Sequence, residues 1–138
     1  MEVYVFSLVL LLVLSATLPA EAQNWKEFKN KHIYLNMPEN KCTNTIKERK
    51  INNGGACKTM NSFIVATDDQ VKAVCGRAGH RVRGNLYESN LRFNVITCIK
   101  KELNPCSYDG RQNALYILIK CERGFPVHYE GQRSSSFP

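Results

Sequence analysis

Residues 91–121 read LRFNVITCIKKELNPCSYDGRQNALYILIKC, and this stretch indicates the class of fold. From Leu91 to Ile99 every second residue is apolar or threonine, which is the period-2 pattern of a strand. The run Ala114–Cys121 is apolar on both faces, as is typical of a central strand in a sheet. Between these two segments, Asp109-Gly110 predicts a turn just before the second strand.

Three helices are predicted before these strands. The first runs from Trp25 to His32, with Asn24 as its N-cap. The second follows Cys42 and ends before the turn-forming run NNGG at residues 52–55. The third opens with a capping box, TDDQ at residues 67–70, whose two acidic side chains lie in its first turn.

Two shorter strands are predicted over Asn61–Val65 and Val127–Glu130, and the polar tail Gly131–Pro138 is expected to be mobile. Helices therefore precede most of the strands, an order that favours an α+β fold with a mainly antiparallel sheet. A length of 138 residues suits one domain, and 43% hydrophobic residues exclude a disordered or collagen-like chain.

The first 22 residues resemble a secretory signal that is removed after Ala22. An apolar run over Val3–Leu14, too short to span a bilayer comfortably, precedes Pro19 and the small-x-small triplet AEA. We therefore expect a secreted, extracellular protein with one domain over residues 23–138. Loss of Glu2 and Glu21 leaves 19 basic against 10 acidic side chains, which raises the net charge from +7 to +9.

Six cysteines lie after the expected cleavage point: Cys42, Cys57, Cys75, Cys98, Cys106 and Cys121. An even number of cysteines in a small secreted chain indicates disulfides rather than a metal site. The spacing alone predicts three bridges without choosing among the possible pairings.

Three local patterns place side chains that could do chemistry. His32 lies four residues after Phe28, so both occupy the inward face of the first helix. Lys58 precedes a predicted strand, and His128 lies on the last predicted strand with Glu130 two residues later. Taken singly, each pattern has an ordinary interpretation, because an inward histidine is most often a core residue and a lone lysine is surface charge.

Taken together, the three patterns resemble the pancreatic ribonuclease A superfamily, and most closely its angiogenin-like members with three disulfides. The resemblance spans Trp25–Glu130 and rests on the helix-borne His32, on CKTMNSF at residues 57–63 and on PVHYE at residues 126–130. It implies a V-shaped, mainly antiparallel sheet with three short helices. The disulfide pairs that it implies are Cys42–Cys98, Cys57–Cys106 and Cys75–Cys121.

The resemblance also implies a reaction that needs no metal or cofactor. RNA carries its own nucleophile, the 2′-OH, so the enzyme has to move two protons and stabilise charge on phosphorus. His32 would take the 2′-OH proton, His128 would protonate the leaving 5′-oxygen, and Lys58 would stabilise the phosphorane. The first product would be a 2′,3′-cyclic phosphate, which is then hydrolysed as the two histidines exchange roles.

The same resemblance assigns residues to substrate binding. The Ser62 hydroxyl can donate or accept, so it would pair with cytosine or uracil and direct cleavage 3′ of pyrimidines. Tyr129 and Met60 would wall the base, and Glu122 matches a position near the next base. The other residues that it assigns to substrate binding are Lys31, Asn61 and Glu130.

Some features depart from the family pattern and affect the expected rate more than the reaction. Lys31, Ser62 and Glu130 stand where the family usually has glutamine, threonine and aspartate. In angiogenin the short tail folds back over the pyrimidine pocket. If Gln132–Pro138 does the same here, turnover would be low.

The positive charge predicts attraction to RNA and other polyanions without selecting among them. A possible receptor or glycan loop consists of Arg77, His80, Arg81 and Arg83, and a second basic cluster consists of Lys47, Arg49 and Lys50. An alternative function is therefore a cationic angiogenic or antimicrobial effector that binds heparin-like glycans, a cell-surface receptor or anionic bacterial membranes with little need for catalysis. By resemblance, a monomer and binding to the cytosolic ribonuclease inhibitor are also expected.

Overall fold

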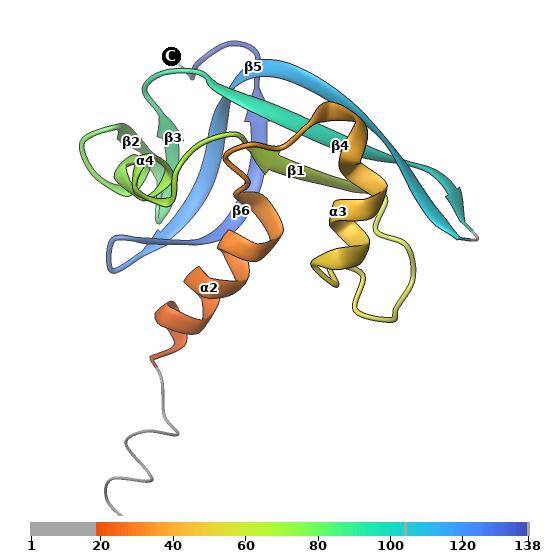
Figure 1. The fold of residues 1–138 in the computed structure, drawn as a ribbon. Coiled ribbons are helices and arrows are strands. Elements are labelled where there is room, and N and C mark those ends of the chain that lie inside the picture. The colour runs from red at the N-terminus through yellow and green to blue at the C-terminus, as the bar shows by residue number, and fades with distance from the viewer. Residues whose placement is uncertain (1–18, 104, 138) are drawn as a thin grey trace, which may run out of the picture.

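The computed structural model describes residues 19–103 and 105–137. Its elements in chain order are α2 (Ala20–His32), η1 (Glu39–Lys41), α3 (Cys42–Glu48), β1 (Met60–Ile64), α4 (Asp68–Lys72), η2 (Ala73–Cys75), β2 (Gly79–Arg83), β3 (Leu86–Ser89), β4 (Phe93–Leu103), β5 (Cys106–Glu122) and β6 (Phe125–Arg133), as Figure 1 shows. The α+β class is confirmed. Within the described residues, no helix has both the length and the apolar character needed to cross a membrane.

Strand β5 joins the two arms of the sheet. Its first part, Cys106–Leu115, pairs with β4, whereas its second part pairs with β3 on one side and β6 on the other. Strand β1 lies on the outer edge of β4, and β2 lies on the outer edge of β3. All of these strand pairs are antiparallel. Because the two arms of the sheet share the long strand β5, the sheet has the expected V shape (Figure 1).

The core consists of two clusters. One packs α2 and α4 against the sheet and centres on Phe28, Ile64 and Ile119. The other packs α3 against β1 and β4 and centres on Ile46 and Phe63. The middle of β4 contributes to both clusters, because residues 95–98 are buried on both faces of the strand.

The turn predicted at Asp109-Gly110 is wrong. Strand β5 continues through both residues, and Gly110 pairs with Cys98 of β4. A Cβ atom on Gly110 would lie only 2.1 Å from the Glu39 carbonyl oxygen and 2.9 Å from Cys42 Sγ. Glycine is needed here because η1 and a disulfide approach the strand closely, and not because the chain turns.

The helix termini follow the sequence only in part. The capping box is confirmed, since the Thr67 hydroxyl accepts from the Gln70 backbone N–H and the Gln70 side chain accepts from the Thr67 backbone N–H. The predicted N-cap at Asn24 is wrong, because α2 already begins at Ala20 after Pro19. Most of the predicted secretory signal, residues 1–18, lies outside the described residues, and its removal stays a prediction.

Three disulfides link distant parts of the chain: Cys42–Cys98, Cys57–Cys106 and Cys75–Cys121. These are the pairs that the family resemblance implies. Each joins residues 46 to 56 positions apart, and cross-links over loops of this length restrict the unfolded chain strongly.

Candidate active site

A cleft of about 530 Å³ lies between α2, β1 and β6. Predicted site residues that line it are His32, Lys58, His128, Lys31, Met60, Asn61, Ser62, Tyr129 and Glu130. Glu122 does not line the cleft and is exposed at the end of β5, where it pairs with Phe125. The structure therefore brings together all the predicted chemical groups except this carboxylate.

His32 is the last residue of α2, and its ring is held on two sides. The Nδ1 atom lies 2.8 Å from the Ser62 carbonyl oxygen, and the ring stacks on Tyr129 with 4.9 Å between centroids. Because a carbonyl oxygen only accepts, Nδ1 is the protonated nitrogen of the neutral ring, and Nε2 carries the lone pair.

The environment of His32 keeps the ring uncharged. Burial lowers the pKa of His32 to about 3, against an opposing effect of the Ser62 carbonyl, and the positive charges of Lys58 and Lys31 lower it further. Burial also raises the pKa of Tyr129, so its hydroxyl stays protonated next to the imidazole. His32 is thus neutral, with its lone pair on Nε2.

Arg49 fixes the end of the helix that carries His32. Its Nη1 atom donates to the Ile33 carbonyl at 2.7 Å and to the Asn30 carbonyl at 2.9 Å. The Asn30 side chain in turn donates to the Arg49 carbonyl at 3.0 Å, which links α2 to the end of α3. The sequence placed Arg49 in a surface cluster of basic residues, whereas the structure uses it to satisfy helix-terminal carbonyls.

Lys58 is positioned by both its backbone and its ammonium group. The Tyr108 hydroxyl donates to the Lys58 carbonyl at 2.6 Å, and the Lys58 N–H donates to Asn52 Oδ1 at 2.9 Å. Its Nζ donates to Asn61 Oδ1 at 2.8 Å, while the buried Asn61 amide donates to the Lys31 carbonyl. Burial lowers the pKa of Lys58, and Lys31 adds to this effect.

His128 lies on β6 with an exposed side chain and a carboxylate partner. Its Nε2 atom is 3.2 Å from Glu130 Oε2, and Lys120 Nζ is 3.7 Å from the same oxygen. An imidazolium whose Nε2–H is taken by a carboxylate still has an Nδ1–H to give to a ligand. Among the described residues, no group of three or more His, Cys, Asp or Glu side chains is arranged to hold a metal ion.

A glutamine occupies the position expected for the pyrimidine base. Gln132 Oε1 accepts from Ser62 Oγ at 2.8 Å and from the Tyr129 hydroxyl at 2.5 Å, and its Nε2 donates to Thr97 Oγ1 at 3.0 Å. Strand β6 extends to Arg133, which carries Gln132 into the cleft. The sequence pattern did not identify Thr97 as a residue of the site. Only the family resemblance indicated that the tail lies over the pyrimidine pocket.

The proposed receptor loop is mainly a strand. His80, Arg81 and Arg83 belong to β2, which pairs with β3, and Arg77 precedes it. Both ring nitrogens of His80 contact other residues, so it is not a free surface cation. The three arginines of that group are exposed.

Comparisons with known proteins agree with this geometry. The model of the family described as pancreatic ribonuclease matches residues 23–130. The chain belongs to the pancreatic ribonuclease family. Ribonuclease-like 3 of Danio rerio is 35% identical over 94% of this chain and 97% of its own length, and Angiogenin-4 of Mus musculus is 34% identical over 89% and 90%. The X-ray structure of zebrafish RNase5 is similar, with 38% identity and a TM-score of 0.76, over 83% of this chain and 100% of that chain.

Proposed function

We propose that this member of the pancreatic ribonuclease family is a secreted endoribonuclease that cleaves single-stranded RNA 3′ of pyrimidines. The observation that carries the proposal is the cleft that gathers an uncharged His32, the Lys58 ammonium group and His128 beside a carboxylate. Membership of the family supports ribonuclease activity, and the predicted leader supports secretion.

In the first step, His32 Nε2 removes the proton from the ribose 2′-OH, and the oxygen attacks the adjacent phosphorus. The hydrogen bond from Nδ1 to the Ser62 carbonyl fixes the tautomer that makes Nε2 the base. His32 becomes an imidazolium at this point, and the negative charge that grows on the phosphorane compensates the cost of that charge in a partly buried site.

Lys58 and His128 complete the reaction. Asn61 holds the Lys58 ammonium group, which stabilises the extra negative charge on phosphorus. His128 donates its proton to the departing 5′-oxygen, and Glu130 keeps the ring oriented for this transfer. The 2′,3′-cyclic phosphate is then hydrolysed with the two histidines in exchanged roles.

Specificity for pyrimidines follows from Ser62 and is limited by Gln132. The Ser62 hydroxyl can donate to or accept from the base edge, so it serves either cytosine or uracil. Gln132 holds that hydroxyl in the structure described here, so a base has to displace it before binding. We therefore expect slow turnover of RNA by the free protein.

The test is cleavage of an end-labelled RNA oligonucleotide by the purified protein, with and without a chelator. Scission 3′ of pyrimidines that persists in the chelator is expected, and His128→Ala should abolish it. Gln112→Ala changes an exposed side chain of β5 outside the cleft and should still cleave. Cleavage by His128→Ala at the wild-type rate would refute the assignment of the acid, and uncut RNA with the wild-type protein would refute the proposed function.

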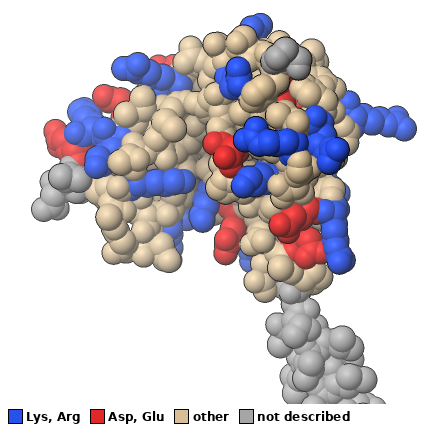
Figure 2. Space-filling model, turned by 180° about the vertical axis from the view of Figure 1, so that it is seen from behind, with Lys and Arg blue, Asp and Glu red and all other residues tan. Residues whose placement is uncertain are grey.

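A second function is favoured by the exposed arginines of β2. Arg81 and Arg83 project from a strand at the edge of the sheet, where a polyanion could reach both. Figure 2 shows basic side chains spread over one face of the molecule with acidic ones among them, which is less selective than a single basic patch. Binding of anionic glycans or membranes should fall in the double variant Arg81→Ser, Arg83→Ser, and unchanged binding would exclude this strand.

A further inference from the structure

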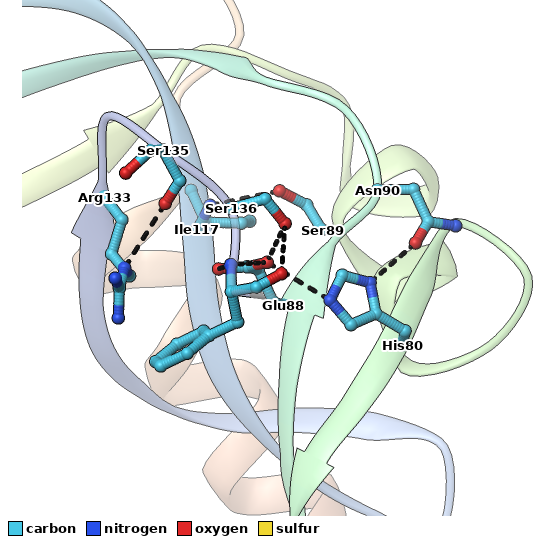
Figure 3. A network of polar contacts seen from close by, with 9 residues as sticks. His80, Glu88, Ser89, Asn90, Ile117, Arg133, Ser135 and Ser136 are labelled. Atoms are coloured by element: carbon cyan, nitrogen blue, oxygen red, sulfur yellow. Dashed lines mark hydrogen bonds and ion pairs between the residues drawn. The ribbon is translucent and has the colours of Figure 1, made fainter.

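Strand β3 carries a carboxylate that is removed from solvent completely. Glu88 has 0% exposure, and a fully buried carboxylate is costly unless donors surround it. Its Oε1 atom lies 3.1 Å from His80 Nε2 and accepts from Ser136 Oγ at 2.6 Å and from the Phe137 backbone N–H at 3.1 Å (Figure 3). One histidine and the C-terminal tail therefore surround this group.

His80 contacts the buried carboxylate from β2. Asn90 donates its amide N–H to the Arg77 carbonyl, so its Oδ1 is the atom that lies 2.8 Å from His80 Nδ1. Both ring nitrogens therefore point at oxygen acceptors, as Figure 3 shows, and a doubly protonated ring satisfies both contacts. The strand pair β2–β3 thus presents a carboxylate that accepts from two donors of the tail.

The tail that contacts this carboxylate is short and is held at several points. Only three residues separate Gln132, which fills the pyrimidine position, from Ser136, which contacts Glu88. Between them, Arg92 Nη2 donates to the Ser134 carbonyl at 2.8 Å, and the Arg133 guanidinium lies 3.8 Å from the centre of the Phe137 ring. Contacts at both ends of this segment therefore favour the position in which Gln132 fills the cleft.

We propose that Glu88 is a positioning residue for RNA cleavage: by anchoring Ser136 and Phe137 it keeps Gln132 in the pyrimidine site and weakens binding of the base. This inference rests on the proposed ribonuclease function. Since Glu88 does not line the cleft, loss of the anchor changes the fraction of molecules with an open base site and leaves the reacting groups in place. The apparent affinity is the intrinsic affinity multiplied by that open fraction.

The experiment compares steady-state kinetics on the dinucleotide cytidylyl-adenosine for the wild type, Glu88→Gln and a chain that ends at Ser135. Loss of the anchor should lower KM by about three- to tenfold, the range expected for a modest coupling between two sites, with kcat little changed. Inhibition by inorganic phosphate alone should stay the same, because phosphate does not need the base site. Ser135→Ala keeps the backbone carbonyl that accepts from Arg133 and should match the wild type.

Combined variants separate positioning from a general structural role. In the chain that ends at Ser135, Glu88→Gln should lower KM no further, and the same holds in the Gln132→Ala background. An unchanged KM in the truncated chain, or a further fall on adding Glu88→Gln to it, would overturn the proposal. If Glu88→Gln does not fold, Ser136→Ala takes its place, because it removes the hydroxyl that donates to Glu88. This variant should also lower KM, and an unchanged KM would overturn the proposal. Absence of cleavage by the wild type would instead refute the proposed function.

Discussion

Replacement of Gln132 by alanine is expected to raise kcat/KM on pyrimidine-containing RNA. The side chain makes three hydrogen bonds inside the cleft, to Ser62, Tyr129 and Thr97. Each such bond contributes about 0.5–1.5 kcal/mol net, and the backbone of Gln132 stays paired in β6 when the side chain leaves. A base renews the bond to Ser62, so the two bonds to Tyr129 and Thr97 set the cost of displacement at about 1–3 kcal/mol, which corresponds to a gain of roughly 5- to 150-fold.

The assay is initial-rate cleavage of cytidylyl-adenosine, with KM and kcat determined separately. Gln112→Ala is the matched control, because Gln112 is an exposed glutamine of β5 that does not line the cleft. The gain should appear mainly in KM, since the alanine variant retains His32, Lys58 and His128. A kcat/KM within twofold of the control would refute the reasoning, because Gln132 would then not compete with the base.

Further predictions concern the supports of the cleft. NMR titration of His32 should give a midpoint far below 6.5, since burial lowers its pKa to about 3, and a midpoint above 6 would contradict this. Between pH 6.5 and pH 3 the unfolded chain binds this proton more readily than the folded chain does. Acidification across that range should therefore lower the free energy of unfolding by at most about 1.4 kcal/mol per pH unit. Arg49→Lys should lower the free energy of unfolding, measured in urea, by about 1–3 kcal/mol, because an ammonium group cannot donate to the carbonyls of Asn30 and Ile33 in the same geometry. Arg111→Lys, at an exposed position of β5, should leave that free energy almost unchanged. Gly110→Ala should lower the thermal midpoint much more than Gly131→Ala, where a Cβ meets no atom within 4 Å; equal midpoints would be inconsistent with the close approach of Glu39.

Features with a local cause were predictable from the sequence. The capping box of α4 depends on residues 67–70 alone, and the apolar run Ala114–Cys121 indicates a central strand wherever it packs. The two catalytic candidates His32 and His128, and Lys58, were identified through motifs, because their spacing in the sequence does not show that they lie close together in the fold. The family resemblance supplied the link that spacing could not.

Features with a tertiary cause were missed or misjudged. Gly110 has the composition of a turn, but its reason is the backbone of Glu39, which is 71 positions away and unrelated by any pattern. From the sequence alone, Arg49 and Glu88 look like ordinary charged residues of the surface. Each is instead enclosed by groups from other elements, and only the packed chain shows which carbonyls or donors they serve.

The cleft is assembled from α2, which precedes the other described elements, and β6, which follows them. A nascent polypeptide that has emerged only as far as β4 already contains His32 and Lys58 but no proton donor for the leaving group. In the proposed mechanism such a chain cannot complete the cleavage of RNA. The order of the residues thus makes the proposed activity depend on synthesis of the chain through β6.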